Sequence, residues 1–230
     1  MESLVAHELR HWSQHGEDGV LQRINQLLPP KYKTFVEIGA HFHEANCLKL
    51  HQHDKWTGVY FDDFHEFHPL GFYKAWITKD NVNTILDRFP FTTTLDILSI
   101  DIDGNDFYIW AALADRFLPQ IAIVEMNPSV PYGEDLVAPY DQNFRWDGTN
   151  WFGCSAYAWW RIMQYRGYSL VYVEKSGVNM FFVRKERQPE TIFEGVDDLE
   201  FLCARIEKIQ YPDDTLHRPF FTSEEAMGFV

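Results

Sequence analysis

The chain has 230 residues and a formal net charge of −14, from 20 Lys and Arg against 34 Asp and Glu. This charge repels phosphate backbones and anionic lipid, so we expect no nucleic-acid partner and no membrane partner. Hydrophobic residues make up 46% of the chain and charged residues 23%, a balance typical of globular proteins and not of disordered ones. The aromatic content of 17% suits a large core or a site lined with rings.

Targeting and redox features predict a soluble, cytoplasmic protein. No stretch is apolar for the length that a bilayer requires, and the N-terminus lacks the apolar region of a secretory signal. Cys47, Cys154 and Cys203 are odd in number and far apart, so they provide neither a disulfide framework nor a metal knuckle. A homo-oligomer is left open.

Short apolar runs alternate with helical stretches through the first half of the chain. The runs are rich in β-branched and aromatic residues, and their near-continuous apolarity indicates strands that are buried on both faces of a parallel sheet. We expect these strands over 34–38, 57–61, 74–78, 95–100 and 121–125, with helices over 44–54, 81–89 and 104–117. Such alternation predicts a doubly wound α/β sheet.

The second half of the chain follows another pattern. A helix over 155–166 precedes two strands, 169–173 and 179–184, whose connection is too short for a helical crossover, so they should be antiparallel. A further helix is expected over 16–28, and one over 197–209. The predicted fold is a doubly wound Rossmann-like sheet, mostly parallel with a final antiparallel strand. We expect an N-terminal helical segment (1–30), the Rossmann-like domain (31–187) and an acidic C-terminal helical extension (188–230).

Candidate ligand-binding residues follow the first two strands. Gly39 lies at a strand-to-helix turn, where glycine lets a ligand approach the backbone closely. The turn lacks the three glycines of a dinucleotide fingerprint, and a tight turn without a ligand is the alternative. Asp62 follows the second strand, about 20 residues after the glycine turn, where a carboxylate can bind a ribose diol. A helix cap or a solvated loop acid is the alternative for Asp62.

Acidic side chains gather after the fourth and fifth strands. Asp101 and Asp103 follow one strand, and Glu125 and Asn127 follow the next. Oxygen ligands such as Asp101, Glu125 and Asn127 suit Mg²⁺ or Ca²⁺ better than a soft metal. The alternative for Asp103 and Asn105 is a capping role at the following helix.

Two further features could serve a site. Of the ten histidines, His41 and His43 flank the glycine turn, where either could be a general base or a metal ligand, while most of the others are expected at the surface. The segment 128–153 is long, aromatic and without periodicity. Following the fifth strand, it would overhang the ligand edge and could line a pocket, although a flap packed on its own rings is equally compatible.

Together these segments resemble a class I S-adenosylmethionine-dependent methyltransferase, most closely the FkbM-like branch. The similar stretches occur in the family's order and extend over roughly residues 13 to 184. They are 13–19, 35–40, 56–59, 77–83, 98–106 and 179–184.

The resemblance implies a role for each of several residues. Glu37 and Gly39 would lie against the methionine part of the cofactor, and Asp62 would hold the ribose hydroxyls. His41 is a further expected cofactor-binding residue. The region of Asn81 would lie near the adenine. The resemblance places Asp101 near the sulfonium and the acceptor. In related oxygen methyltransferases that use a divalent cation, residues at the positions of Asp101, Glu125 and Asn127 bind it.

The chain departs from the family at the glycine turn, with His43 in place of a small residue or Gly, and His41 or Phe42 in place of Asp or Asn. A histidine there can narrow the cofactor pocket or serve catalysis. We therefore expect methyl transfer to a hydroxyl of a small molecule, such as a sugar or a natural-product intermediate, with His43, Asp101 or Asp103 as base. The alternatives are a metal-dependent enzyme of another reaction class on the same scaffold and a non-catalytic binding module.

Overall fold

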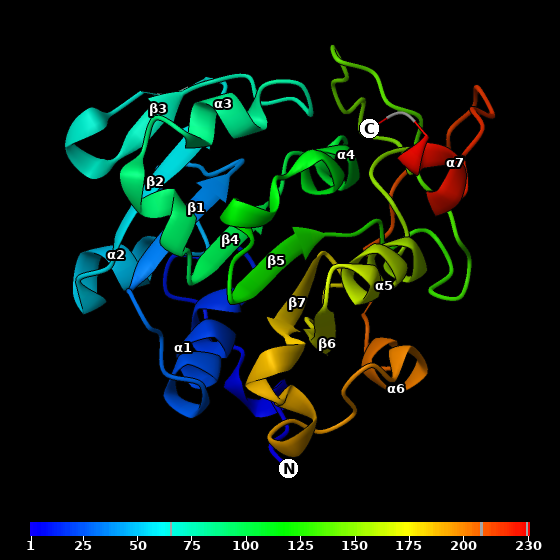
Figure 1. Cartoon of the computed structure of the whole chain (residues 1–230). Coiled ribbons are helices and arrows are strands. Elements are labelled where there is room, and N and C mark those ends of the chain that lie inside the picture. Colours follow the sequence, from blue (N-terminus) through cyan, green and yellow to red (C-terminus); the bar gives the residue numbers. More distant parts are fainter. Residues whose placement is uncertain (65, 208, 229) are drawn as a thin grey trace.

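A seven-stranded sheet forms the centre of the computed structural model, which describes residues 1–64, 66–207, 209–228 and 230 (Figure 1). The strand order is β3-β2-β1-β4-β5-β7-β6. Strands β1 to β5 pair in parallel, and β7 is antiparallel to both β5 and β6. The bounds are Thr34–Ile38 (β1), Thr57–Asp62 (β2), Phe72–Lys74 (β3), Ile97–Ile100 (β4), Ile121–Glu125 (β5), Tyr168–Val173 (β6) and Asn179–Arg184 (β7). The expected mostly parallel sheet with an antiparallel hairpin is confirmed.

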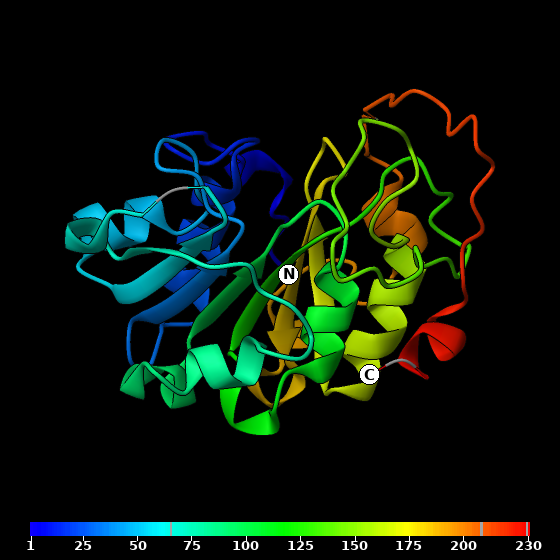
Figure 2. The same ribbon diagram turned by 90° about the horizontal axis from the view of Figure 1, so that it is seen from above.

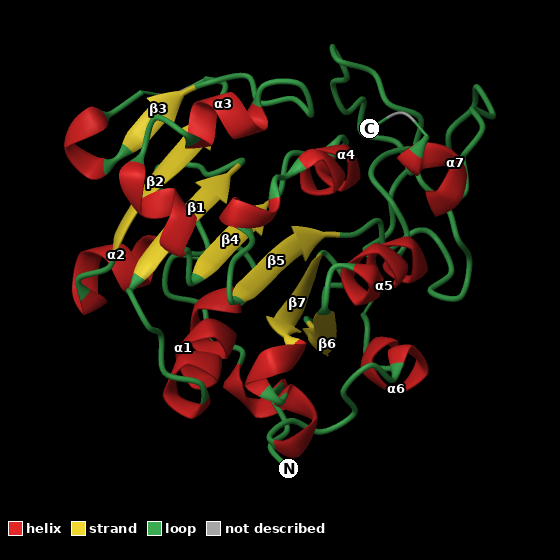
Figure 3. Cartoon of the chain, in the orientation of Figure 1, coloured by secondary structure: helices red, strands yellow, loops and turns green. Residues whose placement is uncertain are grey.

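Helices cover both faces of this sheet (Figure 3). Buried side chains of α1 and α2 join an apolar cluster on one face, and those of α3, α4, α5 and α6 join a cluster on the other. The helices are α1 (Glu17–Leu27), α2 (Leu48–Asp54), α3 (Val82–Leu86), α4 (Asp106–Ala112), α5 (Ala156–Tyr165), α6 (Leu199–Cys203) and α7 (Ser223–Met227), and 3₁₀ turns occupy Val5–His7, His68–Leu70, Pro90–Thr94, Asp115–Phe117, Lys185–Arg187 and Pro189–Thr191. The sheet is therefore doubly wound and Rossmann-like, as the alternation predicted.

The central strands divide their side chains between the two apolar clusters. Val36 and Leu98 belong to the cluster that contains α4 and α5, whereas Phe35 and Ile97 belong to the one that contains α1 and α2. Successive side chains of a strand point to opposite faces, so a strand that is covered on both faces must be apolar at nearly every position. This explains the near-continuous apolar runs of the sequence.

The third strand lies earlier than the expected range 74–78. Phe72 is fully buried and stacks on Tyr60 with 4.2 Å between ring centroids, which draws β3 into register with β2. Beyond β3 the chain turns, because the Asn81 side chain accepts a hydrogen bond from the Thr78 amide and donates one to the Trp76 carbonyl. The predicted strand 74–78 is therefore wrong, and most of that range is a connection.

Several helices are shorter than their apolar patterns predicted. The range 104–117 is divided into α4 and a separate 3₁₀ turn, because Asn83 captures the end of α4: its amide donates to the Ala112 carbonyl and accepts from the Ala114 amide. Among the residues of the range 197–209 that the structure describes, the α-helical ones are the five of α6. Helix α7 was not predicted, although its Thr222 and Glu225 form a capping box that is recognisable in sequence.

The N-terminal segment and the tail both pack against the Rossmann-like unit. Leu4 belongs to the same buried cluster as Val20 of α1 and Phe35 of β1, and a parallel bridge joins Glu2 to Phe193. Another bridge joins Val137, after β5, to Phe221 of the tail. The division at residues 30 and 187 stays a prediction. Within the described part of the chain, no helix combines the length and apolarity needed to cross a membrane.

Candidate functional site

A cavity of about 340 Å³ lies where the carboxyl ends of β1, β2 and β4 meet. This is the edge at which open α/β sheets hold their ligands, and the volume lies within the range of small-molecule pockets. Five residues that the sequence singled out line it: Gly39, His41, Asp62, Asp101 and Asp103. Its other walls come from Ile38, Phe61, Asp63, Phe64, Ala75, Trp76, Ile77, Ile102, Asn105, Phe144, Arg145 and Trp146.

Gly39 brings the ends of β1 and β4 into close contact. Its φ is +93°, and a Cβ built at this position would lie 1.5 Å from the carbonyl oxygen of Asp101. The Gly39 amide donates to the Phe61 carbonyl at 2.8 Å, and the Asp101 amide donates to the Ile38 carbonyl at 2.9 Å. Only glycine satisfies both the positive φ and the close backbone approach. The turn therefore fixes the position of Asp101 in the cavity.

Glu37 does not line the cavity, and its side chain instead binds the backbone of the loop after the turn. Its two carboxylate oxygens accept hydrogen bonds from the backbone amides of Asn46 and Cys47, at 2.6 and 2.8 Å. Burial raises the pKa of Glu37 to about 7 despite these two hydrogen bonds. This attachment holds residues 46 and 47 outside the helix, which explains why α2 begins at Leu48 and not at residue 44, where the predicted range starts.

Of the ribose and adenine candidates, Asp62 lines the cavity and Asn81 does not. Asp62 lines it at the end of β2, where one carboxylate oxygen accepts a hydrogen bond from the Phe64 amide at 2.7 Å. Asn81 lies outside the lining, and its amide shapes the turn that presents Trp76 and Ile77 to the cavity. Asn81 therefore acts on the cavity wall through the backbone.

Three acids meet after β4 and β5. Asp101, Asp103 and Glu125 each offer a carboxylate oxygen, and these oxygens lie within 4.8 Å of one another. Glu125 also accepts a hydrogen bond from the Asp103 amide at 2.9 Å. Among the described residues, none of these acids forms an ion pair with Lys or Arg. The group thus brings together three carboxyl groups whose negative charge a bound cation would neutralise.

Burial, and then the neighbouring carboxylates, raise the pKa values of two of these acids. The pKa of Asp101 is raised well above its usual range by burial and then by Asp103 and Asp106. The pKa of Glu125 is raised well above its usual range by burial and then by Asp101. Burying several carboxyl groups together disfavours the charged form of each, so both shifts have the same direction.

Asp106, at the start of α4, holds the loop that carries the acids. Its carboxylate accepts hydrogen bonds from the Ile102 and Gly104 amides, both at 2.9 Å. Asp106→Ala would leave these two amides without their partner, and we expect a loss of about 2 kcal/mol in the free energy of unfolding. Urea denaturation of the two proteins measures this loss. An unchanged denaturation midpoint would contradict the anchoring role.

Asn127 lies outside the group of acids, and His43 lies outside the cavity. The Asn127 amide donates to the carbonyls of Asn150 and Phe152 and accepts from the Ser129 amide, so its polar atoms serve the backbone after β5. The group of potential metal ligands contains Asp103 in place of Asn127. His43 is exposed and lines a separate surface hollow with Trp12. Neither placement supports its predicted role.

A metal site built on histidine also does not form within the described part of the chain. The one group of potential ligands found there contains only Asp101, Asp103 and Glu125. His41 and His43 have ring centroids 5.9 Å apart at the turn after β1, and both are exposed. His51 and His53 lie on α2, as expected.

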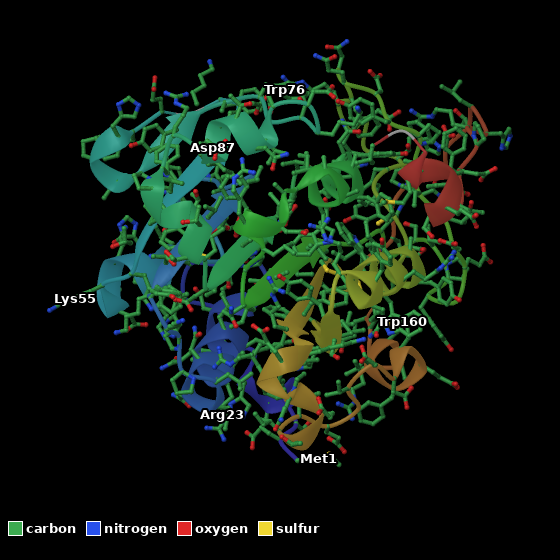
Figure 4. All side chains as sticks on the ribbon, in the orientation of Figure 1. Met1, Arg23, Lys55, Trp76, Asp87 and Trp160 are labelled. Atoms are coloured by element: carbon green, nitrogen blue, oxygen red, sulfur yellow. The ribbon has the colours of Figure 1, made fainter. Side chains whose placement is uncertain are left out.

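Residues 141–146, here called the strap, lie beside the cavity, and Phe144, Arg145 and Trp146 line it. The indole of Trp76, labelled in Figure 4 after β3, donates to the Gln142 carbonyl at 2.9 Å. Arg145 pairs with Asp63 and stacks on Trp76, 4.3 Å from its ring centroid. Phe144 packs on Gly104 so closely that a Cβ there would lie 2.3 Å from the ring. The prediction that the loop after β5 overhangs the ligand edge is confirmed.

Comparison with models of known families and with curated proteins finds no match to this chain. The function is therefore inferred from the cavity and its lining. Sequence reasoning missed Arg145, Asp63 and Trp76, which close the cavity. The aromatic composition singled out the loop, but nothing in the sequence pairs Arg145 with an acid 82 residues away.

Proposed function

We propose that the protein is an S-adenosylmethionine-dependent methyltransferase that acts on a hydroxyl group of a small molecule such as a sugar or a natural-product intermediate. The observation that carries this proposal is the cavity at the sheet edge, where Gly39, Asp62 and Asp101 meet. A mostly parallel sheet that ends in an antiparallel hairpin agrees with the family resemblance of the sequence. Because fold alone does not determine function, the residues of the cavity have to fit the cofactor.

The cavity fits the cofactor in three respects. Gly39 is exposed and lines the cavity, so a ligand can approach its backbone closely. Asp62 lies at the end of β2, where a carboxylate can accept hydrogen bonds from two ribose hydroxyls. The charge around Asp101, which no Lys or Arg among the described residues neutralises, suits a ligand that carries a sulfonium and an ammonium group.

Bound S-adenosylmethionine would supply a methyl group, which an acceptor oxygen attacks in line while S-adenosylhomocysteine leaves. The chain's own contribution is to hold the partners and to exclude water: Asp62 binds the ribose, while Trp76 and Phe144 provide apolar walls. Asp101 lies in the cavity with a raised pKa and would take the proton from the acceptor hydroxyl. Asp103, also in the cavity, is the second candidate base, whereas His43 lines a separate surface hollow, which argues against it.

A divalent cation could assist at the same edge. Asp101, Asp103 and Glu125 would hold Mg²⁺ through carboxylate oxygens, the ligands that this ion prefers. Such an ion would supply charge that lowers the pKa of an acceptor hydroxyl. The same three acids favour one second candidate function, a metal-dependent enzyme of another reaction class. That function predicts binding of Mg²⁺ or Mn²⁺ without any binding of the methyl donor.

Calorimetric titration of S-adenosylmethionine and S-adenosylhomocysteine, each with and without Mg²⁺, tests the proposal. We expect micromolar binding of both, and about tenfold or greater weakening by Asp62→Ala because the hydrogen bonds to the ribose are lost. Asp80→Ala is the matched control: Asp80 is exposed, pairs with Lys79 and lies outside the cavity lining.

The outcomes separate the two candidate functions. Absence of binding at millimolar concentrations of either compound would refute methyl transfer. Cation binding in that case would favour the second function. Equal weakening by Asp62→Ala and Asp80→Ala would refute the placement of the ribose at Asp62, since only one of these acids lines the cavity.

A further inference from the structure

Arg218, in the C-terminal tail, joins the tail to the loop that carries the strap. Its guanidinium donates to Asp147 at 2.7 Å, to the Thr149 hydroxyl at 3.1 Å and to Asp214 at 3.0 Å. The same group stacks on Trp151, 4.1 Å from the ring centroid. One side chain therefore contacts three residues of the loop and one of its own segment.

Backbone and amide contacts extend this junction along residues 211–219, here called the tail clamp. The Asn150 amide donates to Asp213 at 3.0 Å and accepts from the Asp214 backbone at 2.9 Å. The indole of Trp151 donates to the Pro219 carbonyl at 3.0 Å. Seen from above, the loop after β5 and the tail lie side by side (Figure 2). The two segments thus form one structural unit despite their separation in sequence.

The tail clamp reaches the residues of the cavity wall. Tyr211 packs edge-on against Trp146 and against Phe152, with ring centroids 5.3 and 5.4 Å apart. Trp146 lines the cavity and ends the strap, and Asp147, which Arg218 holds, is the next residue. Arg218 itself is not part of the lining. Its contacts therefore act on the cavity only through the position of the strap.

We propose that Arg218 is a positioning residue that holds the strap over the cavity, so that the C-terminal tail determines how firmly a bound ligand is retained. Two attachments keep the strap closed: Arg145 and Trp76 at its β2 side, and the tail clamp at its β5 side. The identity of the retained ligand rests on the proposed function. The attachment of the strap by Arg218 does not depend on it.

Binding of S-adenosylhomocysteine to Arg218→Ala, Arg218→Lys and wild type tests the proposal. We expect Arg218→Ala to weaken binding about tenfold, mainly through faster dissociation in stopped-flow measurements. Arg218→Lys should recover part of the affinity because it keeps the charge near Asp147 but not the planar, forked geometry. Arg205→Ala is the control, since Arg205 also stacks on a ring of the tail, Phe201, but contacts neither strap nor cavity.

Hydrogen exchange of the strap amides supplies a readout that needs no ligand. We expect Arg218→Ala to accelerate exchange in residues 141–147 and to leave β1 and β4 unchanged, whereas Arg205→Ala should not affect the strap. Unchanged strap exchange in Arg218→Ala would overturn the proposal. If wild type binds S-adenosylhomocysteine, an equal affinity in Arg218→Ala would also overturn it. If wild type binds neither S-adenosylmethionine nor S-adenosylhomocysteine, the methyl donor is refuted as the ligand. Faster strap exchange in Arg218→Ala would in that case still support the attachment of the strap by Arg218.

Discussion

Gly39→Ala is expected to lower the free energy of unfolding by about 3 kcal/mol or more and to abolish binding of S-adenosylhomocysteine. The added Cβ would lie 1.5 Å from the Asp101 carbonyl oxygen, a backbone atom that no rotamer change can move away. To relieve the clash, the ends of β1 and β4 must separate, and Asp101 then leaves its place in the cavity. Chemical denaturation measures the stability, and calorimetry measures the binding.

Gly167→Ala separates this clash from simple backbone strain. Gly167 has a φ of +82°, close to that of Gly39, but a Cβ there would meet no atom within 4 Å. We expect only about 1 kcal/mol of destabilisation from the unfavourable φ, with intact binding. Similar losses in both variants would show that positive φ, and not the approach of Asp101, requires glycine at residue 39.

Local sequence patterns predicted the central strands well because burial on both faces permits few residue types there. The ranges of β1, β5 and β7 agree with the observed bounds. The third strand was misplaced because Phe72 gains its position from stacking on Tyr60, a contact that strand propensity does not contain. The end of α4 depends likewise on Asn83, which lies on another element.

The site was partly predictable for the same reason. Residues that follow parallel strands share one edge, so Asp62 and Asp101 could be placed beside the same cavity from their position in sequence. The orientation of a side chain was not predictable, because Glu37 and Asn127 direct their polar atoms to backbone groups of loops. The closure of the cavity by Arg145 and Asp63 depends on how a long loop folds, which periodicity does not specify.

Asp101→Asn is expected to stabilise the protein above neutral pH by about 1–2 kcal/mol while impairing the site. Burial and neighbouring acids raise the pKa of Asp101 in the folded state, so folding favours its protonated form. The stability that this preference contributes is present at low pH and is lost as the pH rises through the folded-state pKa. An asparagine cannot ionise and avoids that loss.

Thermal unfolding in EDTA at about pH 3 and pH 8 measures the difference. We expect wild type and Asp101→Asn to unfold at similar temperatures at about pH 3, below the pKa of an unfolded aspartate, and the variant to unfold at the higher temperature at pH 8. Other acids of this region share the direction: burial raises the pKa of Asp106 to about 6 and that of Glu37 to about 7. The wild type should therefore lose stability between about pH 4 and pH 7 more than one acid alone explains.

The same variant tests the role of Asp101 in binding, because the two forms of the cofactor differ in charge. S-adenosylmethionine carries a sulfonium, whereas S-adenosylhomocysteine is neutral at sulfur, so loss of the Asp101 carboxylate should weaken the first about tenfold more than the second. Asp80→Asn, outside the cavity, should change neither affinity. Equal weakening of both compounds would mean that Asp101 shapes the cavity without facing the sulfonium. If Asp101→Asn is less stable than wild type at pH 8, the carboxylate must make favourable contacts in the folded protein. These contacts would then outweigh the destabilising effects of its burial and of its acidic neighbours.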